Sequence, residues 1–239
     1  MQFDSESKVM SESSQTHTKN VRPVVVSIQN QKGGVGKSTV TINLACTARA
    51  LGWRTMIIDT DPQSTCIGWH RRGGDIDVES SEPSDVPDRL EAEYRKRDFI
   101  FVDTAGSGAA AHSRINDCSD IVIVPFSTSV DDRQPSLDTH FRARRKTRAY
   151  LLPCLVDPRS SGRRINASKT TIQTLLQRLS PEFRAFFLTS IITRRLPLTD
   201  QMASGGSCQS GYRNNESRSE FDRLFEELTQ KLCEGKNEC

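Results

Sequence analysis

"SIQNQKGGVGKSTVTINLA", residues 27–45, is the stretch that decides the fold. It continues a β-branched apolar run that begins at residue 23, and after the glycines apolar residues recur at helical spacing as far as Gly52. The run predicts a buried parallel strand, and the recurrence predicts a helix that ends just before a glycine. The glycine-rich segment between them predicts a loop whose backbone N–H groups converge on an anion, beside the positive end of the helix dipole.

The loop also carries two lysines, Lys32 and Lys37, and a hydroxyl side chain, Ser38, directly after the second lysine. In a phosphate-binding loop of this kind the second lysine reaches the terminal phosphates and the hydroxyl binds Mg²⁺. The usual pattern begins with a glycine where this chain has Gln31, so the loop reads K-G-G-x-G-K-S. The other residues expected to wrap the phosphates are Gly33, Gly34, Val35, Gly36 and Thr39. Two lysines so close together imply a strongly negative ligand.

The rest of the chain alternates apolar runs with amphipathic segments. Strands are predicted at 54–61, 98–106, 120–127, 149–157 and 186–192, and helices at 131–147, 166–179 and 219–232. Strands that alternate with helices indicate an α/β fold, here a three-layer P-loop NTPase fold with a mostly parallel twisted sheet covered by helices on both faces. Residues 72–88 are rich in turn formers and are expected to form a variable surface excursion.

Acidic residues stand at the ends of two predicted strands. Asp59 and Asp61 end one strand, and Asp103 ends the next, three residues before Gly106. In open parallel sheets ligands bind beyond the carboxyl ends of the strands, which is also where the glycine loop begins. One aspartate at a strand end is a weak signal, but three on the phosphate side predict a magnesium-dependent site.

"KGGVGKST" (32–39), "IIDTDPQS" (57–64) and "FIFVDTAG" (99–106) together resemble the ParA/MinD family of ATPases with a deviant Walker-A loop. The resemblance covers roughly residues 22–233 and is closest to the small ParA-type partition proteins that lack an N-terminal DNA-binding domain. It implies a slow, Mg²⁺-dependent ATPase that uses ATP as its nucleotide. Near residues 153–157 the chain departs from the asparagine with which many relatives read adenine, so the adenine preference rests on the resemblance alone.

The resemblance also implies roles for individual residues. Lys32 reaches across a dimer to the partner's nucleotide, and Lys37 contacts the phosphates of its own nucleotide. Asp61 positions the attacking water, and Asp59 supports the magnesium shell. Asp103 holds Mg²⁺ through water, together with Ser38, and Gly106 leaves room for the γ-phosphate. The catalytic set implied is therefore Lys32, Lys37 and Asp61.

Composition limits the domain organisation and the other classes of site. We interpret residues 1–20 as a polar disordered tail and residues 21–239 as a single ATPase domain. The chain shows no secretory signal and no run long enough to span a bilayer. The seven cysteines are odd in number and scattered, which favours free thiols in a reducing cytosol over disulfides or a zinc site. No metal role is assigned to the four histidines.

Positive charge is concentrated in one part of the sequence. The basic window, residues 142–195, holds thirteen Lys and Arg residues against two acidic ones. Such asymmetry predicts a surface that binds a polyanion, although a solvated helix face is the plain alternative. The arginines expected to contact DNA phosphates are Arg142, Arg144, Arg145, Arg148, Arg163, Arg164, Arg194 and Arg195.

The expected function is that of a partition ATPase. It would dimerise with ATP, bind duplex DNA non-specifically and hydrolyse ATP when a small centromere- or cargo-binding adaptor stimulates it, in the cytoplasm and on the nucleoid. A membrane partner is not expected, because the last helix is acidic. Alternatives are a positioning ATPase for a protein cargo, a metabolic ligase of the dethiobiotin-synthetase type, and an iron–sulfur ATPase, for which Cys118 has no convincing second ligand.

Overall fold

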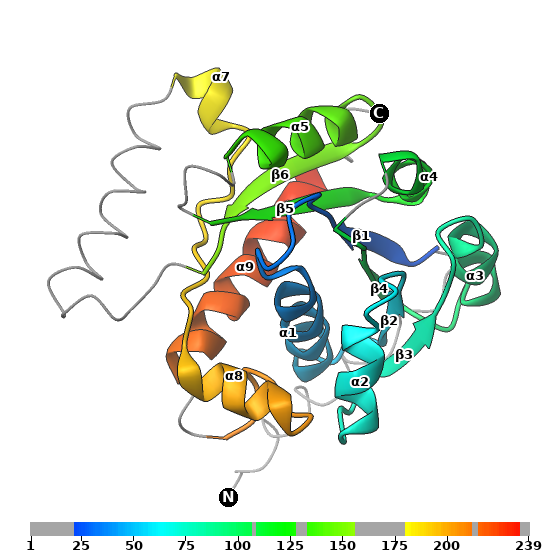
Figure 1. Ribbon diagram of the computed structural model, residues 1–239, viewed down its shortest axis with the longest axis vertical. Helices are drawn as coiled ribbons and strands as arrows, with labels where there is room; N and C mark the ends of the chain where they lie inside the picture. Colours follow the sequence, from blue (N-terminus) through cyan, green and yellow to red (C-terminus); the bar gives the residue numbers. More distant parts are fainter. Residues whose placement is uncertain (1–21, 107–108, 128–132, 156–179, 212–214, 235–239) are drawn as a thin grey trace, which may run out of the picture.

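The computed structural model describes residues 22–106, 109–127, 133–155, 180–211 and 215–234. Its centre is a six-stranded parallel sheet in the order β3-β2-β4-β1-β5-β6 (Figure 1). The strands are β1 (Val24–Ile28), β2 (Thr55–Asp59), β3 (Asp77–Ser80), β4 (Phe99–Asp103), β5 (Ile121–Phe126) and β6 (Arg148–Pro153). The helices are α1 (Lys37–Ala50), α2 (Thr65–Arg71), α3 (Val86–Ala92), α4 (Ala109–Cys118), α5 (Arg133–Arg144), α7 (Pro181–Arg184), α8 (Leu196–Ala203) and α9 (Asn215–Glu234). This arrangement confirms the predicted three-layer fold.

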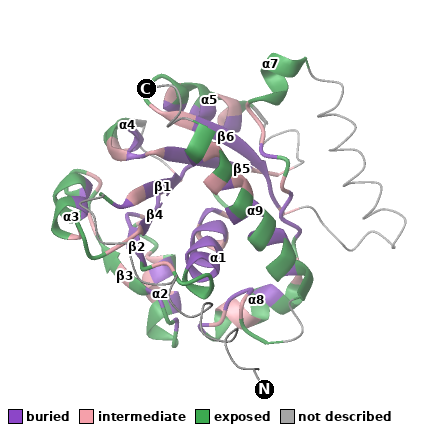
Figure 2. Cartoon of the chain, turned by 180° about the vertical axis from the view of Figure 1, so that it is seen from behind, coloured by how far each residue is buried: buried purple, intermediate pink, exposed green. Residues whose placement is uncertain are grey.

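The two faces of the sheet bury alternate residues of the same strands. In β1, Val26 and Ile28 pack on the side of α1 and α9, whereas Val25 packs on the side of α3 and α4. Helix α5 covers β5 and β6 through a smaller cluster. Because successive strand side chains point to opposite faces, a strand covered on both sides must be apolar throughout, as "VVVSI" nearly is. Figure 2 shows α1 buried along most of its length.

The last described helix, α9, packs into the core as the sequence predicts. Its apolar stripe contains Phe221, Leu224, Phe225, Leu228 and Leu232, and all five are buried. The Phe225 ring lies 5.2 Å from that of Phe99 in β4, measured between ring centroids. The amphipathic pattern of this segment therefore serves packing.

The prediction of a regular strand at 186–192 is wrong. The segment runs beside β6, but only a single bridge joins Leu151 to Phe187. The N–H groups of Thr189 and Ser190 donate to the Glu227 carboxylate, at 2.6 and 2.9 Å. Side-chain acceptors on α9 thus replace the backbone acceptors that a strand ladder would require, so apolar alternation does not produce a strand here.

The prediction of a turn-rich surface excursion at 72–88 is also incomplete. It contains an edge strand, β3, which pairs in parallel with β2 from Met56 to Asp59, and it reaches into the first turn of α3. The sequence "DVES" did not predict a strand, because three of its four residues are exposed and an exposed edge strand needs few apolar residues. The predicted tail at 1–20 and the predicted helix at 166–179 lie outside the described residues.

The described residues contain free cysteines and no helix suited to span a membrane. None of its helices is long and apolar enough to cross a membrane. The six cysteines that the structure describes are free, and four of them, Cys46, Cys66, Cys154 and Cys208, are buried. The described residues also contain no cluster of three or more His, Cys, Asp or Glu side chains suited to a metal ion.

Candidate nucleotide-binding site

The glycine loop joins the end of β1 to the start of α1. Gly34 and Gly36 adopt positive φ angles of 76° and 96°, a region in which any other side chain is strained. Gly36 is the N-cap of α1 and makes no side-chain cap, so the first N–H groups of the helix face the loop. The local sequence therefore builds an anion cradle from backbone donors.

Asn30, which the sequence reasoning did not select, fixes where this loop begins. Its amide nitrogen donates to Pro125 O at 2.7 Å and to Ser136 Oγ at 2.9 Å, and its amide oxygen accepts from Lys32 N at 2.9 Å. The last contact is an Asx turn, in which an Asn side chain replaces a backbone acceptor. An asparagine at the end of the predicted strand, three residues before the first glycine, was the available signal.

Lys37 is the buried cation of the site. Its side chain lies in the first turn of α1, only 7% of the residue is exposed, and Nζ donates to Lys32 O at 3.2 Å. Burial lowers the pKa of Lys37, while Asp103 and Asp61 act against that shift. Lys32 itself is exposed on the loop. The structure thus separates the two lysines: one points into the site and the other lies on the loop surface.

Asp103 is the buried carboxylate of the site. It ends β4, in register with Asp59 of β2 and Ile28 of β1. It accepts hydrogen bonds from Thr41 Oγ1 at 3.1 Å and Cys66 Sγ at 3.4 Å. Burial raises the pKa of Asp103 to about 6; the Ser38, Cys66 and Thr41 hydrogen bonds oppose that shift, and Asp59 adds to it. Thr41 and Cys66 were not predicted as site residues, because neither belongs to a recognisable motif.

Asp59 and Asp61 lie next to each other but face different partners. The Asp59 carboxylate accepts from the backbone N–H groups of Asp61, Cys66 and Ile67 at 2.9–3.2 Å. It therefore holds the turn that carries Asp61 and the start of α2. Burial raises the pKa of Asp59 despite these bonds. Asp61 is partly exposed, and its carboxylate accepts from Gln63 N at 2.9 Å.

Gly106 closes the site from the β4 side. A Cβ atom added to Gly106 would lie 3.4 Å from Gln31 O, 3.6 Å from Gly33 N and 3.6 Å from Lys37 Nζ. A side chain here would occupy the space beside the lysine amine and the loop. The structure therefore brings Lys37, Asp103 and Gly106 together at the carboxyl edge of the sheet, as the sequence predicts.

The donor set also fits a magnesium ion held with a nucleotide. Mg²⁺ prefers a few oxygen ligands and keeps several waters, so it is bound through one or two side chains plus phosphates. Asp103 is hydrogen-bonded to Ser38 at the start of α1, and this pair offers a carboxylate and a hydroxyl on the phosphate side. No cationic side chain of the described chain lies within ion-pair distance of Asp103 that would compete with a metal ion.

The described arginines of the basic window lie in two separate groups. Residues Arg163 and Arg164 lie outside the described residues. Arg142, Arg144, Arg145 and Arg148 lie where α5 ends and β6 begins, at the edge of the sheet opposite the glycine loop. Arg194 and Arg195 directly precede α8, far from α5 in Figure 1. Proximity in sequence therefore does not place these charges side by side.

Several of these arginines are already engaged. Arg195 forms ion pairs with Glu216 and Glu220 of α9. Arg148 donates to Lys231 O at 2.7 Å, and the Arg144 guanidinium lies 4.4 Å from the centroid of the Phe186 ring. Arg142 and Arg145 line a cavity that is described below. Arg194 is exposed, which leaves the DNA-binding assignment of the set as a proposal.

Comparison with known proteins places the chain in a family. The CobQ/CobB/MinD/ParA nucleotide-binding domain matches residues 26–230. The chain is 32% identical over 170 residues to the maintenance of carboxysome distribution protein A of Gloeobacter kilaueensis, a match that covers 69% of this chain and 76% of that protein. It is 35% identical over 130 residues to the chromosome partitioning protein ParA of Caulobacter vibrioides, which covers 48% of this chain and about half, 49%, of that relative.

A solved structure agrees with the fold. The plasmid partition protein BB_S35 of Borrelia burgdorferi, bound to AMPPNP, superposes with a TM-score of 0.65 at 19% identity and covers 87% of this chain and 99% of that one. The family match spans most of the sequence, and the glycine loop, the strand-end aspartates and the parallel sheet all agree with it. The chain is a member of the CobQ/CobB/MinD/ParA nucleotide-binding family, a ParA/MinD-like ATPase related to partition and positioning proteins.

Proposed function

We propose that the chain is a ParA-type partition ATPase that binds and hydrolyses ATP with Mg²⁺ as a nucleotide-sandwich dimer. The observation that carries the proposal is the group of Lys37, Asp103 and Gly106 around the glycine loop: a buried amine, a buried carboxylate, and a glycine whose missing side chain leaves space beside the amine and the loop. These are the parts that phosphoryl transfer requires, because catalysis there is mostly positioning and charge neutralisation.

Each residue then has one task in hydrolysis. The loop N–H groups and Lys37 hold the β- and γ-phosphates, and Gly106 allows the γ-phosphate to approach. Ser38 and Asp103 would hold Mg²⁺, which neutralises the charge that develops on the phosphates when it is bound. Asp59 fixes the turn that carries Asp61, through the N–H groups of Asp61, Cys66 and Ile67. Asp61 orients the attacking water.

Lys32 supports the dimeric form of the proposal. It lies exposed on the loop, five residues before the buried Lys37, and this exposure supports a role toward a nucleotide on a second copy. Two ATP molecules between two subunits carry about eight negative charges, and Coulomb attraction at short range in a desolvated interface is strong. A second lysine per loop is then electrostatically favourable and makes the complete site depend on dimerisation.

Substitution of Lys32 tests the proposed cross-subunit role. The Lys32→Ala variant should still bind nucleotide but lose ATP-dependent dimerisation and turnover, because the cross-subunit charge is removed while the loop is kept. Multi-angle light scattering with ATP and with ADP measures the dimer. Arg71→Ala, which removes an exposed arginine of α2, is the matched charge control and should dimerise normally. A normal ATP-dependent dimer of Lys32→Ala would overturn the cross-subunit role.

The proposal includes non-specific DNA binding by the basic window. Four of its arginines gather where α5 ends and β6 begins, and a dimer presents this group twice. Phosphate contacts carry no sequence information, so binding should be indifferent to sequence and should fall with salt, by roughly 10³-fold between 50 and 200 mM if about six contacts form. This surface would place the protein on the nucleoid.

Electrophoretic shift with ATP, random-sequence duplex DNA and a salt series tests DNA binding. Double reversal at Arg144 and Arg145 to glutamate should weaken binding to all sequences by about tenfold or more and lower the salt slope by about two. Reversal of Arg71, outside the window, is the control and should change little. Arg195 is unsuitable for reversal, since its two ion pairs to α9 are structural. Equal DNA affinity of the double variant and wild type would contradict the assignment to this edge.

A second candidate is a positioning ATPase of the same mechanism with a protein cargo. It is favoured by the similarity over 76% of the length of the carboxysome-distribution protein. Both candidates need a small adaptor that links the ATPase to its cargo and stimulates hydrolysis. Co-purification of the ATP-bound dimer with the product of a neighbouring gene would separate them: a centromere-binding protein supports partition, and a protein-shell adaptor supports positioning.

A further inference from the structure

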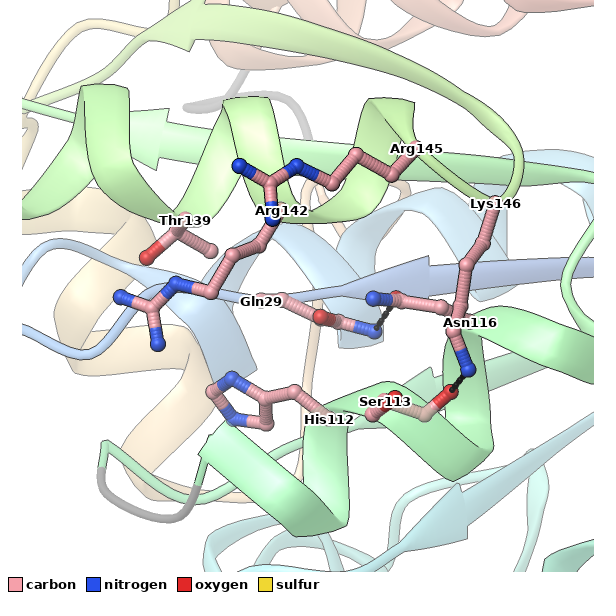
Figure 3. Close-up of a pocket in the computed structure, with 8 residues that line it drawn as sticks. All are labelled: Gln29, His112, Ser113, Asn116, Thr139, Arg142, Arg145 and Lys146. Carbon is pink, nitrogen blue, oxygen red and sulfur yellow. Dashed lines mark hydrogen bonds between the residues drawn. The ribbon is translucent and has the colours of Figure 1, made fainter.

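Between α4 and α5 lies a cavity of about 200 Å³, on the sheet face opposite α1. It is lined by Gln29, His112, Ser113, Asn116, Thr139, Arg142, Arg145 and Lys146 (Figure 3). None of these is a carboxylate. A water molecule takes up about 30 Å³ of liquid, so the cavity is large enough for several waters or for a small polyatomic anion. It plays no part in the nucleotide site described above.

The floor of this cavity is an unsatisfied amide. Gln29 directly follows β1 and is fully buried. Its Nε2 donates to Ser27 Oγ at 3.0 Å and to Asn116 Oδ1 at 2.7 Å, so both of its protons are used. Its Oε1 is buried and has no hydrogen-bond partner. Figure 3 shows this amide between Asn116 on one side and Arg142 and His112 on the other. A buried acceptor without a donor destabilises the fold unless a ligand or water supplies the donor.

Two of the three cationic side chains in the cavity walls have no acidic partner among the described residues. Arg142 uses only Nε, which donates to Asp138 O at 3.1 Å, and so its two terminal nitrogens have no acceptor among the described residues. The Arg145 side chain makes no ion pair or hydrogen bond with any other described residue; only its backbone N–H is bonded, to Arg142 O at 3.3 Å. Lys146 differs, because Asp117 Oδ2 accepts from it at 2.6 Å. Two unpaired guanidinium groups therefore face a cavity whose floor offers one unmatched acceptor.

We propose that this cavity binds hydrogen phosphate, with anionic oxygens accepting from Arg142 and Arg145 and a P–OH group donating to Gln29 Oε1. The ligand must present both charge and a proton, because the walls are donors and the floor is an acceptor. Inorganic phosphate keeps at least one P–OH at neutral pH. A phosphomonoester has its second pKa near 6 and is mostly without that proton, and sulfate and the phosphodiesters of DNA have none.

Equilibrium dialysis with radiolabelled inorganic phosphate at pH 7 tests the proposal. Saturating Mg·ADP fills the nucleotide site, so that only binding elsewhere is counted. Wild type should bind about one phosphate per chain. Arg142→Gln and Arg145→Gln should each weaken binding about tenfold or more, the size expected for one charge-assisted hydrogen bond. Arg114→Gln, an exposed arginine of α4 that does not line the cavity, should bind like wild type.

Competition then tests the role of the proton. Sulfate and O-phosphoserine should each displace labelled phosphate about tenfold less effectively than unlabelled phosphate, because sulfate has no acidic proton at pH 7 and the phosphate group of O-phosphoserine has mostly lost its own. Equal competition by sulfate would overturn the role of Gln29. Equal binding by Arg142→Gln and Arg114→Gln, or no saturable binding at millimolar phosphate, would leave a water-filled cavity only.

The outcome is separable from that of the proposed function. Lys37→Ala disables the glycine loop but leaves every residue of the cavity intact. This variant should therefore bind phosphate as wild type does, whatever becomes of its ATP turnover. Loss of phosphate binding in Lys37→Ala would assign the bound phosphate to the nucleotide site and contradict the proposal.

Discussion

Two regions of the molecule bury a carboxylate almost completely, and they treat it in opposite ways. Between α9 and the segment that precedes α8, Glu220 is 2% exposed and accepts from Thr193 N at 2.9 Å, Thr193 Oγ1 at 2.7 Å and Arg195 Nη2 at 3.2 Å. At the end of β4, Asp103 is 0% exposed and is bonded only by hydroxyl and thiol groups. One carboxylate has an arginine, and the other has no cation bonded to it.

The difference shows which charge serves the fold and which serves a ligand. A buried charge is costly unless a cation or strong donors compensate it. Glu220 is compensated within the chain, so its negative charge ties α9 to the neighbouring segment. Asp103 is not, and Asp59 beside it adds repulsion, so the pKa of Asp103 rises to about 6. The folded chain thus holds a destabilised carboxylate at the position where Mg²⁺ would supply the missing positive charge.

Neutralising the structural carboxylate should have the largest effect on stability. Glu220→Gln keeps the shape but leaves Arg195 with one carboxylate fewer, and the Arg195 Nε is already buried without a partner. We expect the free energy of unfolding to fall by about 2–3 kcal/mol, the range for hydrogen bonds to charged groups. Urea denaturation measures it. Glu227→Gln, at a less buried contact of the same helix, is the control and should cost about 1 kcal/mol. If both variants lost the same free energy of unfolding, the deeper burial of Glu220 would have no special effect.

Neutralising Asp103 should raise the free energy of unfolding, whereas neutralising Glu220 lowers it. Asp103→Asn removes a buried charge to which no cation is bonded, and Thr41 and Cys66 can still bond to the amide. In the absence of metal and nucleotide, the variant should be more stable than wild type by about 1–3 kcal/mol at pH 7, from the pKa difference between folded and unfolded chain. Urea denaturation in EDTA measures this gain. A clear loss of stability would show that Asp103 is structural, like Glu220.

The dependence of stability on pH gives a second test of the role of Asp103. The folded pKa of Asp103, about 6, exceeds the unfolded value of 3.8, so the folded state binds the proton more tightly and ionisation destabilises the wild-type fold as pH rises from about 4 to 6. The stability advantage of Asp103→Asn should therefore grow over that interval and level off above it. His140, whose burial lowers its pKa to about 4, contributes the opposite slope in both proteins, so the difference between variant and wild type is the quantity to measure. An advantage independent of pH would contradict the assignment to Asp103.

The sequence predicted the nucleotide side of the molecule well. The order strand, glycine loop, helix is local, and parallel strands bring their carboxyl ends to one edge, so Asp59, Asp103 and Gly106 meet the loop wherever the sheet forms. The same rules placed five of the six strands. The edge strand β3 was missed because its residues are mostly exposed, and the segment at 186–192 was overpredicted because side chains of α9 take its N–H groups.

Features that depend on contacts between distant segments were not predictable. Thirteen basic residues in one window suggested one surface, but helix α5 and the start of α8, each with arginines of that window, lie far apart (Figure 1). The ion pairs of Arg195 come from α9, more than twenty residues away. The cavity at Gln29 needs α4 and α5 beside the end of β1, and no spacing in the sequence indicates that arrangement.

The most direct test of the account is urea unfolding of wild type and Asp103→Asn, each with and without Mg·AMPPNP. Wild type should gain about 2.7 kcal/mol at a ligand concentration one hundred times its dissociation constant. Asp103→Asn should begin from a more stable apo state but gain little from Mg·AMPPNP, because it lacks the carboxylate proposed to hold the metal. If Asp103→Asn were less stable than wild type without ligand and gained as much from Mg·AMPPNP, the buried aspartate would belong to the fold and the proposed magnesium–nucleotide site would be wrong.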